Sequence, residues 1–386
     1  MTKAGQQLTA RGVALEALVA IDRGARANAT VAELLARSGL DERDRGLVTE
    51  LVYGTCRMFR ACDWISDRYV RTKIDEQVRA AIRLGVYQLG WMRVPPHAAV
   101  SATVGEVKGP GRSVANAVLR RCASQLASGP TVWPDPATQL SYPDWIVERL
   151  SHDLGPTDAR DALETMNRPA SATARADGYI QDRASQMVAE HVSRLAGPRA
   201  RVLDVCAAPG GKSTGIAGDG DGWVVAGDFS EDRVGVLKSN VARLGLDNVS
   251  VVVSDGREPP WRDGAFDAVL VDAPCSGLGV LRRRPDARWR VNPADVDRLA
   301  GIQRGLLLAS LPLVRPGGVV VYSVCTLTMT ETAAVDRWLA GAAAGFEPLP
   351  PPGAPWKPAG RGALLLPQTE GTDGMFILAV RAPQVG

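Results

Sequence analysis

Two cysteines occupy equivalent places after two hydrophobic segments in the second half of the chain. Cys275 lies in DAPCSG (272–277), directly after the run 266–271, and Cys325 follows the run 319–324. Both runs predict buried parallel strands, so both cysteines are expected at the carboxyl edge of one sheet, where open α/β folds bind ligands. A free cysteine is often only a small buried hydrophobe. The paired placement beside Asp272 instead favours nucleophilic chemistry.

A second segment, RVLDVCAAPGGKST (201–214), predicts a strand, a glycine-containing turn and the start of a helix. Glycines at such a turn let backbone N–H groups approach a nucleotide-like ligand, and the helix N-terminus favours an anionic group. Taken alone, the pattern suits NAD, a phosphate or S-adenosylmethionine, and it lacks the full G-x-G-x-x-G spacing.

Three acids that follow apolar runs narrow the choice among these ligands. Asp228 comes after WVVAG (223–227), Asp255 after VSVVVS (249–254), and Asp272 after FDAVLV (266–271). At strand ends, Asp228 is placed to accept ribose hydroxyls and Asp255 to meet an adenine amino group. Acids also simply cap strand ends and turns. Three acids at the ends of three apolar runs are harder to explain as caps. Because the sequence has no second phosphate-binding motif, they favour a methyl-donor nucleoside over a dinucleotide as the ligand.

The motifs DVCAAPGGKST (204–214), DAPCSG (272–277) and SVCTL (323–327) together resemble the RNA 5-methylcytosine methyltransferases of the RsmB/Sun (Fmu) and NOL/NOP/Sun type. The resemblance implies an α/β Rossmann-like S-adenosylmethionine-dependent methyltransferase core preceded by an all-α NusB-like domain. It also implies transfer of a methyl group from S-adenosylmethionine to carbon-5 of a cytosine in RNA, with small-subunit ribosomal RNA as the leading substrate.

Carbon-5 of cytosine is a poor nucleophile, and addition of a thiolate to carbon-6 raises its electron density. The resemblance assigns the nucleophile to Cys325 and product release to Cys275, while Asp272 would hydrogen-bond the cytosine edge. The target base would have to be unstacked to reach Cys325. The residues expected at the cofactor are Cys206, Ala207, Ala208, Pro209, Gly210, Gly211, Lys212, Asp228, Arg233, Asp255 and Asp272.

The formal charge of +3 over 386 residues gives little support to RNA binding by itself. The arginine-rich segment LRRRPDARWR (281–290) follows the Cys275 motif and resembles an Arg-Arg-x-Pro-Asp stretch of the family. A charge run is often a solvated face, but this position favours contacts with RNA phosphates. The arginines expected to bind RNA are Arg282, Arg283, Arg284 and Arg288.

Six cysteines show no Cys-x-x-Cys spacing and no companion histidine cluster. Neither a zinc site nor a disulfide framework is indicated, so we expect no metal and a reduced, cytoplasmic setting. The first seven residues lack an apolar signal region, and no apolar stretch predicts a membrane span. The sequence leaves the oligomeric state open, with a monomer favoured.

Domain boundaries follow from composition and resemblance. Residues 1–128 read as helices and carry the NusB-like blocks ELVYGTCR (50–57) and NAVLR (116–120). Residues 129–177 are expected to form a proline-rich linker and a short helical connector, and 178–386 the methyltransferase domain. Related proteins usually insert a small RNA-recognition subdomain after the connector. Here Pro169 is followed almost directly by the lead-in GYIQD (178–182), so this insert is missing or severely cut.

Two smaller departures from the family are Val324, where a threonine usually precedes the nucleophile, and Glu331-Thr332 in place of Glu-Asn. Neither removes a reacting group. Two other functions remain open. The missing subdomain and near-neutral charge allow a small-molecule or peptide substrate in the same crevice. The helical domain allows a protein that acts mainly as an RNA-binding or assembly factor.

Overall fold

A computed structural model describes residues 8–384; the seven residues predicted to carry no signal region lie outside this range. The chain divides into two compact units. The helical unit is formed by the residues up to Glu148 together with Leu281–Arg290. The sheet unit is formed by Arg149–Val280 and the residues from Val291 onward. Each unit is described here by itself.

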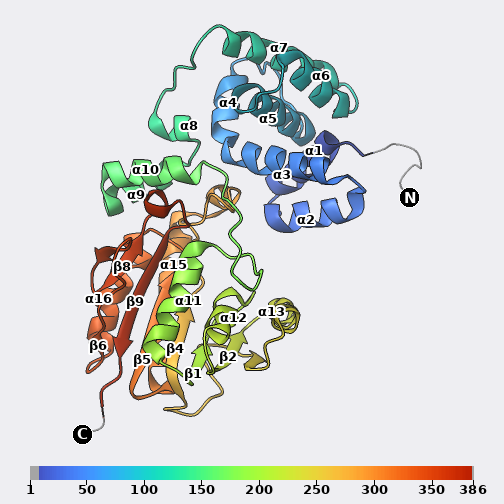
Figure 1. Cartoon of the computed structure of the whole chain (residues 1–386). Helices are drawn as coiled ribbons and strands as arrows, with labels where there is room; N and C mark the ends of the chain where they lie inside the picture. Colours follow the sequence, from blue (N-terminus) through green and yellow to red (C-terminus); the bar gives the residue numbers. More distant parts are fainter. Residues whose placement is uncertain (1–7, 385–386) are drawn as a thin grey trace. The chain divides into compact units, whose positions relative to one another are not determined.

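The helical unit is a bundle around one apolar core (Figure 1). Four of its described helices begin at side-chain caps, because Thr9, Asp41, Asp75 and Asp135 each accept a backbone N–H of the first turn. Helix α4 continues almost directly from α3, and all eight described helices lie in the region predicted to be helical or in the predicted connector. The helices are α1 (Ala10–Asp22), α2 (Ala27–Ser38), α3 (Glu42–Arg57), α4 (Phe59–Asp67), α5 (Glu76–Trp91), α6 (Pro96–Glu106), α7 (Gly111–Ala127) and α8 (Pro136–Leu140).

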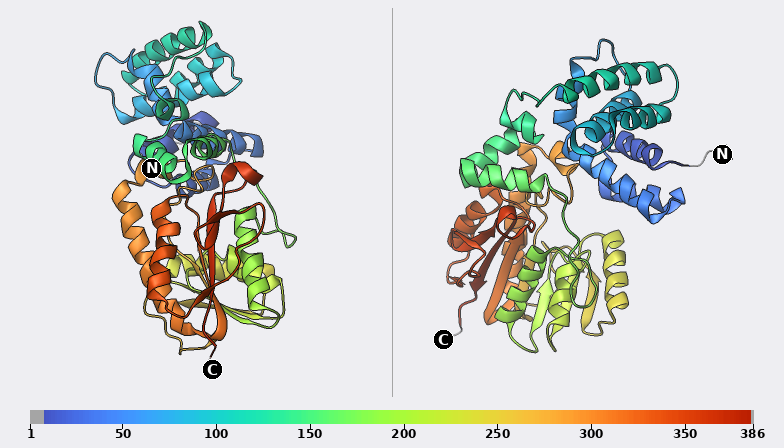
Figure 2. Two further views of the ribbon diagram at one scale, coloured as in Figure 1. Left: turned by 90° about the vertical axis from the view of Figure 1, so that its left-hand side faces the viewer. Right: turned by 45° about the horizontal axis from the view of Figure 1, so that its top comes forward.

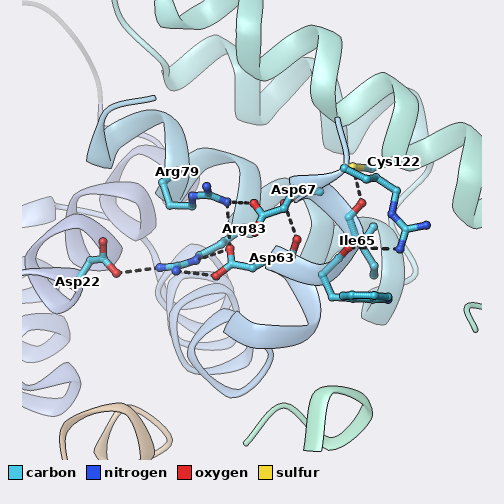
Figure 3. A network of polar contacts seen from close by, with 10 residues as sticks. Asp22, Asp63, Ile65, Asp67, Arg79, Arg83 and Cys122 are labelled. Atoms are coloured by element: carbon cyan, nitrogen blue, oxygen red, sulfur yellow. Dashed lines mark hydrogen bonds and ion pairs between the residues drawn. The ribbon is translucent and has the colours of Figure 1, made fainter. Parts of the chain in front are cut away.

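An ion-pair network ties three helices of this unit together (Figure 3). Arg83 on α5 contacts Asp63 of α4 at 2.7 Å and Asp22 at the end of α1 at 2.8 Å. Arg79 contacts Asp63 at 3.4 Å and also pairs with Asp67. Burial alone would lower the pKa of Arg83, but its hydrogen bond to Asp63 and the nearby carboxylate charges raise it. Arg83 therefore keeps its charge, and its ion pairs join α1, α4 and α5.

The segment Leu281–Arg290 packs within the helical unit although it lies far along the chain. It ends in α14 (Ala287–Arg290). The indole N–H of Trp289 donates to the Cys56 carbonyl at 2.7 Å, and the Asp286 carboxylate accepts the Ala27 backbone N–H at 3.3 Å. Each predicted domain was one continuous stretch of the chain, so the return of residues 281–290 to the helical unit was not predicted.

This placement corrects the RNA-contact prediction for two of the four arginines. Arg288 is fully buried, lies 3.8 Å over the Tyr142 ring, and donates to the Ser141 carbonyl at 3.1 Å. Burial lowers the pKa of Arg288 to about 10. Arg282 is 6% exposed, and its carbonyl accepts from Arg57 at 3.0 Å. Arg288 therefore lies inside the helical unit, and the Arg282 side chain is buried as well.

The sheet unit contains one mixed nine-stranded sheet with the order β3-β2-β1-β4-β5-β9-β8-β7, and β6 pairs with β9. Strands β1 to β5 are parallel neighbours, whereas β9 runs antiparallel to β5 and to β8. This confirms the predicted Rossmann-like core. The strands are β1 (Arg201–Asp204), β2 (Trp223–Asp228), β3 (Val249–Val253), β4 (Phe266–Asp272), β5 (Val314–Val324), β6 (Glu347–Pro348), β7 (Lys357–Ala359), β8 (Gly362–Leu365) and β9 (Met375–Arg381).

Helices cover both faces of this sheet. Figure 2 shows α11 and α12 on one side of the sheet and α15 and α16 on the other. Helix α9 (Asp144–Leu154) crosses the division between the units. The remaining helices are α10 (Pro156–Met166), α11 (Arg183–Ala196), α12 (Gly211–Gly218), α13 (Glu231–Leu244), α15 (Pro293–Ser310), η1 (Leu311–Leu313), η2 (Met329–Glu331), α16 (Ala333–Ala342) and α17 (Pro367–Glu370).

The connection from α10 to α11 is short. Between Met166 and Arg183 it contains one isolated bridge, Ala174 to Ile180, and no further element among the described residues. No helix in the described range 8–384 is long and apolar enough to cross a membrane. The order of the strands reverses between β1 and β4, and ligands of open α/β sheets bind at the carboxyl ends beside such a reversal.

Candidate active site

The turn after β1 requires glycine at position 210. Gly210 has a φ of +107°, and a Cβ there would lie 2.4 Å from Leu237 Cδ1. The turn is held against β2 because the Ala207 backbone N–H donates to the Gly227 carbonyl at 2.8 Å. Helix α12 then starts at Gly211. The turn therefore leads directly into the N-terminus of a helix, which suits an anionic part of a ligand.

Asp228, at the end of β2, is a buried acid that fixes this turn. Its carboxylate accepts the backbone N–H groups of Ala208 and Ser230, each at 3.1 Å. Arg233 lies 3.3 Å from the same carboxylate and also donates to the Ala208 carbonyl. Asp228 and Arg233 thus lie together at the turn, as predicted for cofactor residues.

Asp255 and Phe229 also follow strand ends. Hydrogen bonds from the Arg257 side chain and backbone lower the pKa of Asp255, whose side chain is 28% exposed. Phe229 directly follows Asp228 and is 72% exposed. The sequence analysis missed Phe229, and its position after an acid at the end of an apolar run was the available signal.

Asp204 is a buried acid at the end of β1. The Ser213 hydroxyl donates to Asp204 Oδ2 at 2.6 Å, while Oδ1 has no hydrogen-bond partner among residues 8–384. Burial raises the pKa of Asp204 from 3.8 to about 7, although the Ser213 hydrogen bond opposes the change. This acid therefore titrates near neutral pH.

The Asp272 carboxylate accepts hydrogen bonds from one charged and one neutral side chain. Lys212 Nζ donates to Asp272 Oδ2 at 2.7 Å, and the Ser323 hydroxyl donates to Oδ1 at 2.9 Å. Burial would lower the pKa of Lys212, but the charge and the hydrogen bond of Asp272 raise it above its ordinary value. The two donors come from α12 and β5, so the Asp272 carboxylate is held between these two elements.

The two predicted cysteines lie against each other. Cys275 Sγ and Cys325 Sγ are 3.3 Å apart, and both residues are partly exposed. The contact with Cys325, followed by burial, raises the pKa of Cys275 well above its ordinary value. Cys275 is therefore a thiol in this arrangement and holds a proton beside Cys325.

Backbone contacts join the loops that carry these cysteines. The Gly279 N–H donates to the Cys325 carbonyl at 3.0 Å, and a Cβ on Gly279 would lie 2.3 Å from the Gly374 carbonyl oxygen. Ala273 N–H donates to the Ser323 carbonyl at 3.0 Å. The loops after β4 and β5 thus approach closely enough to bring the two thiols together.

The sheet unit brings together the predicted residues from Cys206 to Lys212 with Asp272, Cys275 and Cys325, while Asp255 lies on the loop after β3. The four predicted RNA-contacting arginines belong to the helical unit. Within the described part of the chain, no group of three or more His, Cys, Asp or Glu side chains forms a metal site.

Family models match both parts of the chain. The model of the 16S rRNA methyltransferase RsmB/F matches residues 196–381, and the NusB family model matches residues 8–124. The probable ribosomal RNA small subunit methyltransferase B of Bacillus subtilis is 31% identical, with 97% of this chain and 99% of the relative covered. The corresponding Pseudomonas putida protein, ribosomal RNA small subunit methyltransferase B, is 30% identical, with 87% of this chain and 90% of the relative covered.

The Bacillus alignment extends over 444 positions, more than the 386 residues of this chain, so that relative contains residues with no counterpart here. Among solved structures, PH0851 has a TM-score of 0.77 at 20% identity, covering 97% of this chain and 99% of that one. A methyltransferase homologue from Pyrococcus horikoshii has a TM-score of 0.53 at 25% identity, covering 65% and 100%. The chain belongs to the RsmB/F family of S-adenosylmethionine-dependent 16S rRNA methyltransferases, with a NusB-type domain before its catalytic core.

Proposed function

We propose that this protein methylates carbon-5 of a cytosine in small-subunit ribosomal RNA through a covalent adduct with Cys325. The observation that carries the proposal is the 3.3 Å contact between the Cys325 and Cys275 thiols beside Asp272. Methylation of a nitrogen or an oxygen atom needs no pair of thiols, whereas carbon-5 methylation needs a nucleophile and a group for product release.

The residues around the first turn fit S-adenosylmethionine, which supplies an electrophilic methyl group when bound. We propose that Lys212 and the backbone from Cys206 to Gly211 hold the methionine end, since the α12 N-terminus and an ammonium group both favour a carboxylate. Asp228, positioned by Arg233, holds the ribose, and Asp255 the adenine. The exposed Phe229 ring covers one face of the adenine.

The cysteines divide the chemistry between them. The Cys325 thiolate forms a bond to carbon-6, and the carbon-5–carbon-6 π electrons move toward carbon-5. Asp272 accepts a hydrogen bond at the cytosine edge and favours transient protonation of the ring, which aids the addition. Once the Cys325 sulfur is bound to carbon-6, the contact that raises the pKa of Cys275 is lost, so Cys275 releases its proton to water. After carbon-5 carries its new methyl group, the Cys275 thiolate accepts the carbon-5 proton. The electrons of that bond reform the double bond, and the Cys325 thiolate leaves.

RNA contacts in the segment 281–290 are proposed only for Arg283 and Arg284, because Arg282 and Arg288 are buried. We keep the proposed division into a NusB-like domain (1–128), a connector (129–177) and a methyltransferase domain (178–386), with the return segment 281–290 as an addition to the first. A monomer acting in the cytoplasm, where ribosomal RNA is found, completes the proposal.

The test is transfer of radiolabelled methyl from S-adenosylmethionine to naked small-subunit ribosomal RNA that lacks its own carbon-5 cytosine methylation. Nucleoside analysis should show 5-methylcytidine at one position, and Cys325→Ala should abolish the label. A label in another nucleoside would overturn the cytosine assignment. No label, with cofactor binding intact by calorimetry, would favour a small-molecule substrate, a reading that the short connection between α10 and α11 also supports.

A further inference from the structure

Glu331 is a buried acid of the sheet unit that the mechanism above does not use. It lies at the end of η2, shortly after Cys325, and its exposed fraction is 0%. Within residues 8–384 it forms no ion pair with a Lys, Arg or His side chain. A buried carboxylate without a cation requires hydrogen-bond donors.

Five donors converge on this carboxylate from three segments of the chain. Oε1 accepts the Ser276 backbone N–H at 2.8 Å and the Gln303 amide at 3.0 Å. Oε2 lies 2.5 Å from the Ser276 hydroxyl, 3.1 Å from the Thr326 hydroxyl and 2.9 Å from the Thr328 hydroxyl. The carboxylate therefore joins the loop after β4, helix α15 and the loop after β5.

Two of these donors directly follow the cysteines, since Ser276 is next to Cys275 and Thr326 is next to Cys325. Their hydroxyl oxygens lie 2.9 Å from each other. The two hydroxyl protons can fill only two of the three contacts among Ser276, Thr326 and Glu331. A charged acceptor is the stronger one, so both protons are directed to the carboxylate.

We propose that Glu331 is a positioning residue that sets the separation of the Cys275 and Cys325 thiols. The two loops leave different strands, and the carboxylate fixes the residue beside each cysteine relative to the other. Covalent catalysis depends on ångström-scale placement of reacting groups, so loss of this contact lowers turnover. The consequence for methylation rests on the proposed function, whereas the consequence for thiol separation does not.

Thiol separation can be measured directly with phenylarsine oxide, a trivalent arsenical. One molecule condenses with two thiols, forming two arsenic–sulfur bonds and releasing one water, with no change of oxidation state. The wild-type full chain should bind the arsenical through Cys275 and Cys325, as shown by peptide mapping. The Cys325→Ala variant should not form this two-thiol adduct, and this loss shows which cysteines bind the arsenical in the wild type.

In Glu331→Ala we expect the affinity for the arsenical to fall by about tenfold or more, because five donors lose their common acceptor. Turnover should fall at an unchanged KM for S-adenosylmethionine. Glu331→Gln should stay within about threefold of the wild-type affinity, because its amide oxygen accepts from Ser276 and Gln303 while its NH₂ donates to the hydroxyls. A folded Glu331→Ala variant with wild-type arsenical affinity would overturn the proposal.

Two buried threonines provide a matched pair that does not depend on folding of Glu331→Ala. Thr326 and Thr328 both contact Glu331 Oε2, but only Thr326 adjoins a cysteine. Both valine variants should lose similar thermal stability, about 1 kcal/mol each by the cited value for one hydrogen bond. Thr326→Val should weaken arsenical binding by about threefold or more, and Thr328→Val by less than about twofold. Equal effects would assign Glu331 a general structural role and overturn the proposal.

The arsenical assay uses neither RNA nor cofactor, so it separates this inference from the proposed function. If the wild type binds the arsenical but methylates no RNA, the positioning role stands and the substrate assignment fails. If methylation at carbon-5 is found while Glu331→Ala keeps both affinity and turnover, the positioning role fails alone.

Discussion

Asp63 of the helical unit and the acids Asp204 and Glu331 of the sheet unit are held by different kinds of donor. In the helical unit, Asp63 is paired with Arg83 at 2.7 Å and Arg79 at 3.4 Å (Figure 3). In the sheet unit, Asp204 and Glu331 are buried and held by hydroxyl and amide donors. The ion pairs of Asp63 join helices, whereas Asp204 and Glu331 are held by neutral donors and lie near the strand ends that carry the chemistry. We therefore expect substitutions at the strand ends of the sheet unit to change turnover, and substitutions in the ion-pair network to change stability.

Cys325→Ala should give the largest effect in either unit. Loss of the nucleophile should reduce methyl transfer by about a thousandfold or more, because no other group makes the covalent adduct. Thermal unfolding should change little, since Cys325 is only partly buried. A single-turnover assay with radiolabelled methyl donor measures the effect. Retained methylation would remove Cys325 from the mechanism.

Cys275→Ala should separate product release from adduct formation. The Cys325 thiolate can still add to the base, but the adduct should break down slowly, so a protein–RNA species should accumulate. A denaturing gel with labelled RNA should show a retarded band that is missing in the Cys275→Ala/Cys325→Ala double variant. Absence of the band from the single variant, with RNA binding intact, would count against a role of Cys275 in release.

Asp63→Ala should cost stability and leave the chemistry intact. It leaves two partly buried arginines without their shared acid, and we expect about 3 kcal/mol of lost unfolding free energy. Glu16→Ala is the matched control, because Glu16 and Arg37 form an ion pair whose side chains are more than half exposed. The control should lose no more than about 1 kcal/mol. Denaturant unfolding compares the two variants, and similar losses would show that the network contributes no more than a surface pair.

Asp204→Asn should change how stability depends on pH. The pKa of Asp204 is about 7 in the folded protein and 3.8 ordinarily. Between these values the folded state binds a proton that the unfolded state has released, so the free energy of unfolding falls as pH rises. The wild type should lose about 2 kcal/mol more than Asp204→Asn between pH 5 and pH 7. If the free energy of unfolding changes equally with pH in both proteins, the raised pKa of Asp204 is not the cause of the pH dependence.

Much of the active site could be predicted from sequence because strand ends impose it. Apolar runs before Asp272, Cys275 and Cys325 predict parallel strands, and parallel strands bring residues that follow them to one edge. Glu331 was noted only as part of a motif, since its importance depends on donors from Ser276 and Gln303 that are distant in sequence. The sequence around Glu331 does not show that these distant donors meet at its carboxylate.

In the arginine segment 281–290, the sequence pattern did not predict which side chains are buried. A run of charged side chains predicts a solvated surface, and Arg283 and Arg284 remain candidates for such a surface. Arg288 is buried because the Tyr142 ring and backbone carbonyls replace water around its guanidinium. Those partners lie far away in the sequence, so charge patterning alone could not reveal them. The division between α3 and α4 has no local signal, because α4 begins immediately after α3 without a side-chain cap.

The return of Leu281–Arg290 into the helical unit has a consequence for biosynthesis. A chain leaves the ribosome from its N-terminus, and domains generally fold as they emerge. The first unit to be translated here lacks the Trp289 indole and the Asp286 carboxylate until β4 has also been synthesised. The N-terminal bundle therefore reaches its final packing only late in translation, after most of the parallel sheet has left the ribosome.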